Sequence, residues 1–194
     1  DLESNPDIKN LSLERNSPAN SIEIRQSRLE SAGEKVFSSL ENANGQPLTP
    51  VITGELTVGE NASLRLDSGL VWKFNPESGL TIYGGFSASN SVLTSYHDDE
   101  YGGNTDGNSS GERNWNGIVI KSRHPIILDN TTIRFADTGL WMENSEPVLQ
   151  NTIIEDSWIT ALSADFPSVP QISSIVLNRN AINGILIRGN ALPE

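Results

Sequence analysis

The 194-residue chain contains no cysteine, so no disulfide can stabilise its fold and no thiol is available as a nucleophile or metal ligand. Aromatic residues make up only 6% of the chain and apolar residues 36%, which is little for a globule packed around one centre. The longest apolar run is far shorter than a membrane span. We therefore expect an elongated core and no membrane insertion.

Basic residues are also scarce. The 13 Lys and Arg residues stand against 25 Asp and Glu, which gives a formal net charge of −12. A chain of this charge repels nucleic acids and anionic membrane surfaces. It also repels an anionic polysaccharide unless cations bridge the two. We therefore expect no nucleic-acid partner.

One short pattern recurs in four places. It begins with an apolar residue, and Asn or Ser follows two positions later. A second apolar residue comes three positions after that Asn or Ser, and a small or polar residue comes three positions later again. The copies occupy residues 8–16, 128–136, 149–157 and 172–180, and the last three begin 21 and 23 residues apart. A period in the low twenties indicates a solenoid, because such units are too small to bury their apolar face alone and must stack.

A second phrase follows these copies, in which a small residue precedes a short run rich in β-formers. It occurs at 117–120, 139–142, 160–163 and 184–187, with residues 21–24 as the N-terminal copy. Glycine suits a tight corner, and the runs that follow favour strand. No window shows a clear stripe with the period of a helix.

Together these patterns predict an all-β fold, a parallel β-helix of about 20–25 residues per turn with two or three short strands in each turn. Successive turns would lie about 4.8 Å apart. The interior would be a narrow column of Ile, Leu and Val. Residues 27–50 are the least regular part, and the capping-box form of residues 27–30 leaves a short helix there as an alternative.

We predict a single domain over residues 1–194. Residues 1–50 would hold an N-terminal turn and an irregular segment; because residues 1–26 resemble the last turn, they read as the tail of a preceding unit. Residues 95–114 form an acidic insertion rich in Gly and Asn. Neither end carries a closing cap, so we expect either a piece of a longer array or a chain that stacks end to end.

Several phrases between residues 52 and 120 also resemble a known family. They include Leu-Thr-Val at 56–58, Gly-Leu-Val-Trp-Lys-Phe at 69–74, Leu-Thr-Ser at 93–95 before an Asp-Asp-rich loop, and Asn-Trp-Asn-Gly-Ile at 114–118. The chain resembles bacterial surface and secreted proteins with right-handed parallel β-helix repeats, of the pectin-lyase-like superfamily. This resemblance implies a right-handed coil, tandem units and a location outside the cell or at its surface. Family members include adhesins, stalk modules and carbohydrate-active enzymes.

The acidic insertion is a candidate calcium site. Oxygen-bearing side chains cluster there, and Ca²⁺ prefers several hard oxygen ligands. The candidate ligands are Asp98, Asp99, Asn104, Asp106 and Asn108. The alternative is a solvated surface loop in which Asn and Gly make turns.

Strand alternation gives a candidate interface. Neighbouring residues on a strand point to opposite sides, so if the residues flanking them point inward, Val119, Trp141 and Leu186 point outward. Leu162 is expected to point outward with them, unless residues 161–163 run in the opposite phase. Such an apolar stripe would be covered by the chain's own loops, a neighbouring module, another copy, or a sugar stacked on Trp141. The repeated Asn at residues 10, 130 and 151, with Ser174 in the same slot, is interpreted as a structural ladder.

An enzyme requires more than these features. In the superfamily that the chain resembles, glycosidases use paired carboxylates on one face. Here Asp137 and Asp156 could stack on adjacent turns, but no third partner falls into register. No nucleophile motif, phosphate loop or zinc spacing is present, so we assign no catalytic residues.

The sequence therefore favours a non-catalytic structural or adhesive β-helix module of an extracellular or cell-surface bacterial protein. Its expected partners are neighbouring modules, other copies of the chain, or a polysaccharide. The alternative is a carbohydrate-active enzyme, a polysaccharide lyase or glycoside hydrolase, or its glycan-binding remnant.

Overall fold

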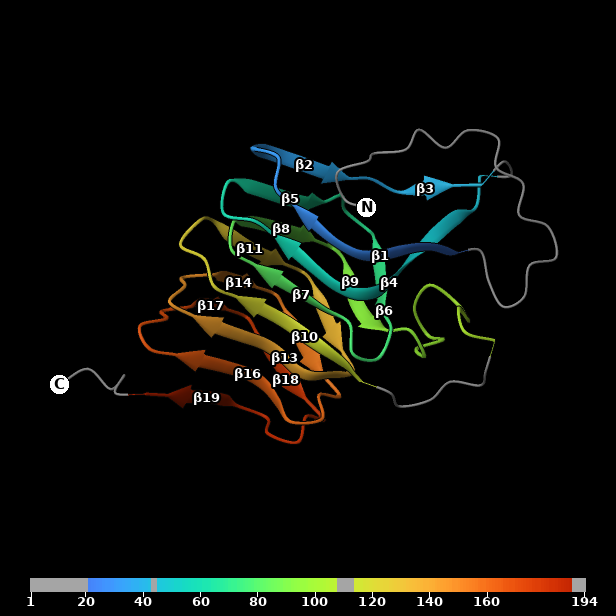
Figure 1. Cartoon of the computed structure of the whole chain (residues 1–194). Coiled ribbons are helices and arrows are strands. Elements are labelled where there is room, and N and C mark those ends of the chain that lie inside the picture. The colour runs from blue at the N-terminus through green and yellow to red at the C-terminus, as the bar shows by residue number, and fades with distance from the viewer. Residues whose placement is uncertain (1–20, 43–44, 108–113, 190–194) are drawn as a thin grey trace.

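The structure is a computed structural model that describes residues 21–42, 45–107 and 114–189. These residues form nineteen β-strands and no helix. All but one of the strand pairs are parallel, the exception being the pair of β3 (Leu40–Glu41) with β4 (Pro47–Val58). Strands from successive turns stack on one another along the solenoid (Figure 1). The predicted all-β parallel β-helix is confirmed.

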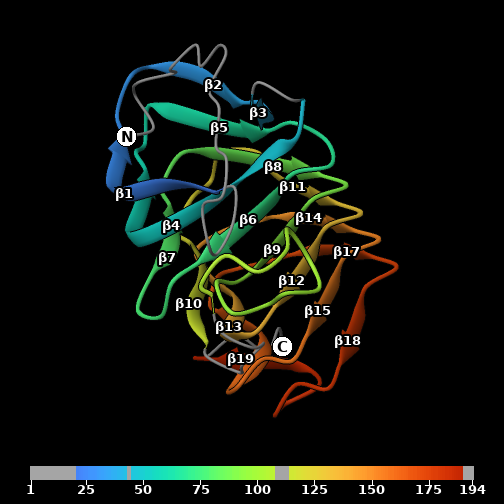
Figure 2. The ribbon, with the colours of Figure 1, turned by 90° about the vertical axis from the view of Figure 1, so that its right-hand side faces the viewer.

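From β5 (Ala62–Leu66) onward, each turn contributes one strand to each of three faces (Figure 2). The first face contains β4, β7 (Gly79–Ile82), β10 (Trp115–Ile120), β13 (Ala136–Glu143), β16 (Thr160–Asp165) and β19 (Ile185–Arg188). The second contains β2 (Gly33–Phe37), β5 (Ala62–Leu66), β8 (Gly85–Ser89), β11 (Ile126–Asp129), β14 (Val148–Gln150) and β17 (Gln171–Ser173). The third contains β6 (Val71–Phe74), β9 (Val92–Ser95), β12 (Thr132–Arg134), β15 (Ile153–Glu155) and β18 (Val176–Asn178).

The repeated pattern sets the register between turns. Leu128 pairs with Leu149, which pairs with Ile172, on the second face. The second apolar residue of each copy stacks in the same way on the third face, at Ile133, Ile154 and Leu177. Residues of equal rank in the pattern are therefore neighbours in adjacent turns.

The interior contains aromatic rings as well as the expected aliphatic column. Phe74 stacks on Trp115 with ring centroids 4.1 Å apart, and Phe37 meets Trp72 edge-on at 5.0 Å. The Trp115 indole donates a hydrogen bond of 2.8 Å to the carbonyl oxygen of Arg134. The expectation of Ile, Leu and Val alone is thus wrong for the turns that hold these rings.

The repeated Asn marks the corner between the second and third faces. Asn90, Asn130, Asn151 and Ser174 all have φ between 47° and 57° there. This left-handed conformation is one that Asn tolerates better than most residues. The Asn130 amide also donates to the Asn90 side-chain oxygen at 2.5 Å. The arrangement agrees with the structural role expected for this column, while Asn10 lies outside the described residues.

In the N-terminal part, the short helix left open as an alternative does not form, and one expectation is wrong. Residues 27–29 belong to β1 (Ser21–Leu29) and residues 33–37 form β2, so no helix forms in the described part of residues 27–50. Residues 21–24 pair with residues 49–52 of β4, and Val51 and Ile52 pair in turn with β6. They therefore continue the third face, whereas the sequence pattern aligned them with the first.

Candidate functional site

The described part of the acidic insertion, up to residue 107, lies across the outer surface of the third face (Figure 2) and is held there by a buried lysine. Lys73 of β6 is fully buried, and its ammonium donates to the carbonyl oxygens of Asp98, at 2.6 Å, and of Gly103. Burial lowers the pKa of Lys73, while the carboxylate of Asp98 opposes that shift. The Asp98 carboxylate accepts a hydrogen bond of 2.6 Å from Thr94 of β9.

Arg134 of β12 is the second cation beneath the insertion. Its Nη1 donates to Asp98 at 3.3 Å and to Glu100 at 2.7 Å, and its Nε lies 2.9 Å from Glu155 of β15. Burial alone would lower the pKa of Arg134, but the hydrogen bond to Glu100 and the charges of Asp98 and Glu155 raise it above the ordinary value. Arg134 therefore stays charged and links the insertion to the next turn.

The candidate calcium ligands do not converge on one point among the described residues. Asp98 faces Arg134 and Thr94, Asp106 bonds to His97, and the Asn104 side chain accepts from the backbone of Gly107 at 2.7 Å. One Asp99 oxygen is buried and accepts no hydrogen bond from any described residue. Asn108 lies outside the described residues. No group of three or more His, Asp or Glu side chains that could hold a metal occurs in the described part of the chain, and calcium binding remains a prediction.

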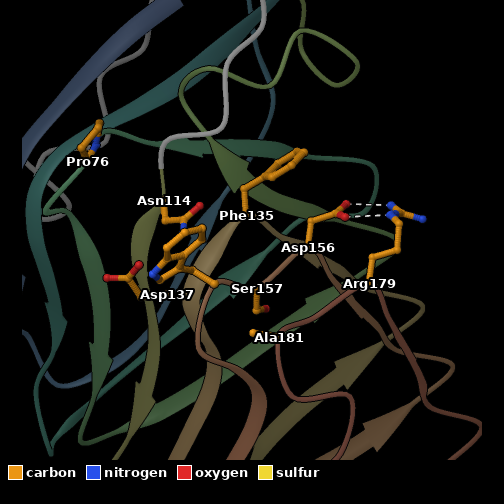
Figure 3. Close-up of a pocket in the computed structure, with 9 residues that line it drawn as sticks. Pro76, Asn114, Phe135, Asp137, Asp156, Ser157, Arg179 and Ala181 are labelled. Carbon is orange, nitrogen blue, oxygen red and sulfur yellow. Dashed lines mark hydrogen bonds and ion pairs between the residues drawn. The ribbon is translucent and has the colours of Figure 1, made fainter.

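A pocket of about 780 Å³ lies at the corner between the third and first faces, and we call it the corner pocket (Figure 3). Most of its lining residues flank the small or polar residue that ends a copy of the repeated pattern in three consecutive turns. Ser157 is one of those ending residues itself, and Pro76 and Asn114 come from two earlier turns. Its lining residues are Pro76, Asn114, Phe135, Asp137, Asp156, Ser157, Trp158, Arg179 and Ala181. Phe135, Asp156 and Arg179 all have positive φ, so the same backbone corner recurs in each turn.

The two carboxylates of the corner pocket differ in their surroundings. Both oxygens of Asp156 accept hydrogen bonds of 2.7 Å from Arg179 (Figure 3). These bonds and the charges of Asp156 and Glu155 raise the pKa of Arg179. The Asp137 carboxylate makes no hydrogen bond or ion pair with any described residue. Trp158 is 71% exposed, which is unusual for the largest apolar side chain.

The candidate interface on the first face is only partly as expected. Val119, Trp141 and Leu186 are half-buried in outward positions. Leu162 is fully buried in the core and pairs with Leu140, so the expected outward position is wrong. Residues 161–163 run in the opposite phase, and Ser163 takes the outward position beside Trp141.

The chain's own side chains surround Trp141. Its indole donates to Asp165 at 3.1 Å, and the guanidinium of Arg188 lies 5.5 Å from the ring centroid. Ser163, next to it in register, is almost fully buried. Trp158 therefore offers a more accessible aromatic surface than Trp141 does.

Sequence reasoning singled out Asp137 and Asp156 but missed Trp158, Phe135 and Arg179. The available signal was their position, because each flanks the residue that ends a copy of the pattern in one of three adjacent turns.

No protein-family model, no curated protein and no solved structure matches this chain. The resemblance to the pectin-lyase-like superfamily therefore remains a prediction. In residues 21–42, 45–107 and 114–189, no helix is long and apolar enough to cross a membrane.

Proposed function

We propose that this chain is a non-catalytic β-helix module of an extracellular or cell-surface protein that holds a neutral glycan in its corner pocket. The stacked parallel ladders supply a rigid support, as expected of a spacer or adhesive segment. The observation that carries the proposal is the exposed Trp158 beside the carboxylate of Asp137 in one pocket.

The chemistry of the pocket supports a sugar as its ligand. An exposed indole offers a flat apolar surface on which the C–H face of a sugar ring can lie. The Asp137 carboxylate can accept hydrogen bonds from sugar hydroxyls, since no described residue already occupies it. The net charge of −12 opposes an acidic polysaccharide, so a neutral glycan is favoured.

Binding to a panel of neutral and acidic oligosaccharides, measured by calorimetry, tests the proposal. Replacing Trp158 with Ala should weaken binding of the neutral ligand by about tenfold or more, because the stacking surface is lost. Phe166→Ala is a matched control, since Phe166 is also exposed, at 61%, but does not line the pocket. Absence of binding to every member of the panel, or equal loss in both variants, would refute glycan binding at this pocket.

A carbohydrate-active enzyme is the second candidate, because two carboxylates line the same pocket. Against it, both oxygens of Asp156 are held by Arg179, which leaves this group poorly placed to donate a proton. Release of reducing ends or unsaturated products from the same panel distinguishes the two. Cleavage that disappears in Asp137→Asn would establish the enzyme and overturn the non-catalytic module.

A further inference from the structure

Arg134 of β12 contacts two parts of the molecule that lie far apart in the sequence. Its Nη1 donates to Asp98 at 3.3 Å and to Glu100 at 2.7 Å, both in the acidic insertion. Its Nε lies 2.9 Å from Glu155, and its Nη2 lies 3.8 Å from Asp156, which lines the corner pocket. The side chain is only 7% exposed, so salt screens these charges far less than it screens a surface pair.

The aromatic neighbours of Arg134 are divided in the same way. The guanidinium carbon lies 5.0 Å from the ring centroid of Tyr101, in the insertion. It lies 4.9 Å from the ring centroid of Phe135, which lines the corner pocket (Figure 3). Both distances are within the range in which a cation is attracted to the face of an aromatic ring. One side chain therefore links the insertion to the pocket wall through two kinds of contact.

Arg179 binds the same two carboxylates from the next turn. One oxygen of Glu155 lies 2.9 Å from Arg134, and the other lies 3.0 Å from Arg179. Oδ2 of Asp156 lies 2.7 Å from Arg179 and 3.8 Å from Arg134. The two arginines thus share two carboxylates, and the position of one arginine affects how tightly the other is held.

The insertion limits how far the charge of Arg134 serves Asp156. Nη1 is bound by Asp98 and Glu100, and Nη2 stays 3.8 Å from Asp156, beyond hydrogen-bond distance. Without Glu100, the guanidinium would lose its shortest contact in the insertion and would be free to move toward Asp156. It would then take over part of the role of Arg179. Contacts that share a residue in this way contribute non-additively to stability.

From these contacts we infer that Arg134 is a positioning residue that couples the acidic insertion to the corner pocket. The insertion holds the guanidinium, and the guanidinium sets how the carboxylates of Glu155 and Asp156 are divided between the two arginines. Coupling between two sites is reciprocal, so a glycan that binds the pocket wall in this arrangement also strengthens the attachment of the insertion. That consequence rests on the glycan proposed for the corner pocket, whereas the coupling itself does not.

A double-mutant cycle that needs no ligand tests the coupling. Glu100→Gln removes the contact in the insertion, and Arg179→Met removes the cation on the pocket side. No hydrogen bond or ion pair joins Glu100 to Arg179 in the described part of the chain, and both side chains are exposed, at 65% and 53%, so each variant should fold. Urea unfolding gives the equilibrium constant for unfolding of the unmodified chain, the two single variants and the double variant.

The effects of the two substitutions should not multiply. Because Arg134 released from Glu100 takes over part of the role of Arg179, the double variant should unfold with an equilibrium constant about threefold or more below the product expected from the single variants. A direct attraction between Glu100 and Arg179 through space would give a deviation of the same sign, but that deviation would persist in an Arg134→Met background. Coupling through Arg134 disappears there. In an Arg134→Lys background it shrinks, because an ammonium does not bind several carboxylates as the guanidinium fork does.

Arg65→Met combined with Glu100→Gln is the control cycle, since Arg65 is also an exposed arginine with two carboxylate partners. The effects of these two substitutions should multiply. The inference is overturned if the effects of Glu100→Gln and Arg179→Met also multiply, or if their deviation is unchanged in the Arg134→Lys background. That background decides the outcome if Arg134→Met is too unstable to fold, which circular dichroism reveals.

Limited proteolysis measures the reciprocal effect of a ligand. A neutral oligosaccharide from the calorimetric panel that binds the unmodified chain should slow cleavage of the insertion severalfold, and this protection should be reduced in Arg134→Lys. Binding without slower cleavage in the unmodified chain would overturn the reciprocal link between pocket and insertion. If no member of the panel binds, the glycan proposal fails, and the ligand-free cycle still decides whether Arg134 couples the two parts.

Discussion

Replacing Arg134 with Met tests how the acidic insertion is held to the solenoid. The Arg134 side chain is only 7% exposed and lies within 4 Å of four carboxylates, two from the insertion and two from the next turn. Removing one partner of a buried ion pair costs about 3–5 kcal/mol, because the remaining charges are left unpaired. Here Asp98 keeps Thr94, and Glu155 keeps Arg179, so we expect a loss near the lower bound, about 3 kcal/mol.

Arg65→Met is the matched control. Arg65 also pairs with two carboxylates, Glu34 at 3.3 Å and Asp67 at 3.0 Å, but its side chain is 44% exposed. Exposed ion pairs contribute about 0–1 kcal/mol, and salt screens them. The contrast is between a buried arginine with four carboxylate neighbours and an exposed arginine with two.

Urea unfolding followed by tryptophan fluorescence gives the free energy of unfolding of each variant. For a chain of this size, a loss of 3 kcal/mol lowers the melting temperature by roughly 6–12 °C. Limited proteolysis should also cleave the insertion of Arg134→Met earlier than that of the unmodified chain. If Arg134→Met and Arg65→Met lose the same free energy, or if the Arg134 effect vanishes in 1 M salt, the buried network does not hold the insertion.

Three further predictions concern single features. Gly117→Ala should strongly lower the melting temperature, since Gly117 has φ of 95° and an added Cβ would lie 1.8 Å from the Thr138 carbonyl oxygen. Gly184→Ala is the control and should change the melting temperature little, because no atom lies within 4 Å of a Cβ added there. Burial lowers the pKa of the Lys73 ammonium below 10.5, so as the pH rises the folded chain loses the Lys73 proton before the unfolded chain does. The free energy of unfolding should therefore rise between the pKa of Lys73 in the folded chain and pH 10.5. Urea titrations of the Lys73→Met variant should lack that rise. If the acidic insertion binds calcium, a free calcium concentration one hundred times the dissociation constant should raise the free energy of unfolding by about 2.7 kcal/mol. An unchanged melting temperature at millimolar calcium would refute calcium binding.

The repeat could be predicted because stacking in a solenoid is local and periodic. A residue such as Leu149 meets Leu128 and Ile172 at nearly constant separation along the chain, so spacing alone sets the register. The sequence left the phase of residues 161–163 open because Ala161, Leu162 and Ser163 are all compatible with burial, and all three are buried. Only the pairing of Leu162 with Leu140 decides which one points inward.

The attachment of the acidic insertion could not be predicted in the same way. Lys73 bonds to the carbonyl oxygen of Asp98 within the irregular insertion, and Arg134 bonds to Glu100, 34 residues away, a separation that does not belong to the repeat. An arginine in an outward position on a strand normally faces water, so the sequence gives no reason to expect Arg134 to be buried. The insertion removes that water, and a long-range contact of this kind leaves no periodic signal.

The acidic composition of the insertion follows from what lies beneath it. Lys73 and Arg134 would be exposed cations on the third face if the insertion were absent, and covering them without counter-charges would be costly. Carboxylates from the insertion offset that cost at Arg134, and carbonyl oxygens offset it at Lys73. Arg134 also precedes Phe135 and lies 3.8 Å from Asp156, both of which line the corner pocket. The charge network that fastens the insertion therefore continues into the wall of the pocket, and the position of Asp156 depends on cations from two different turns.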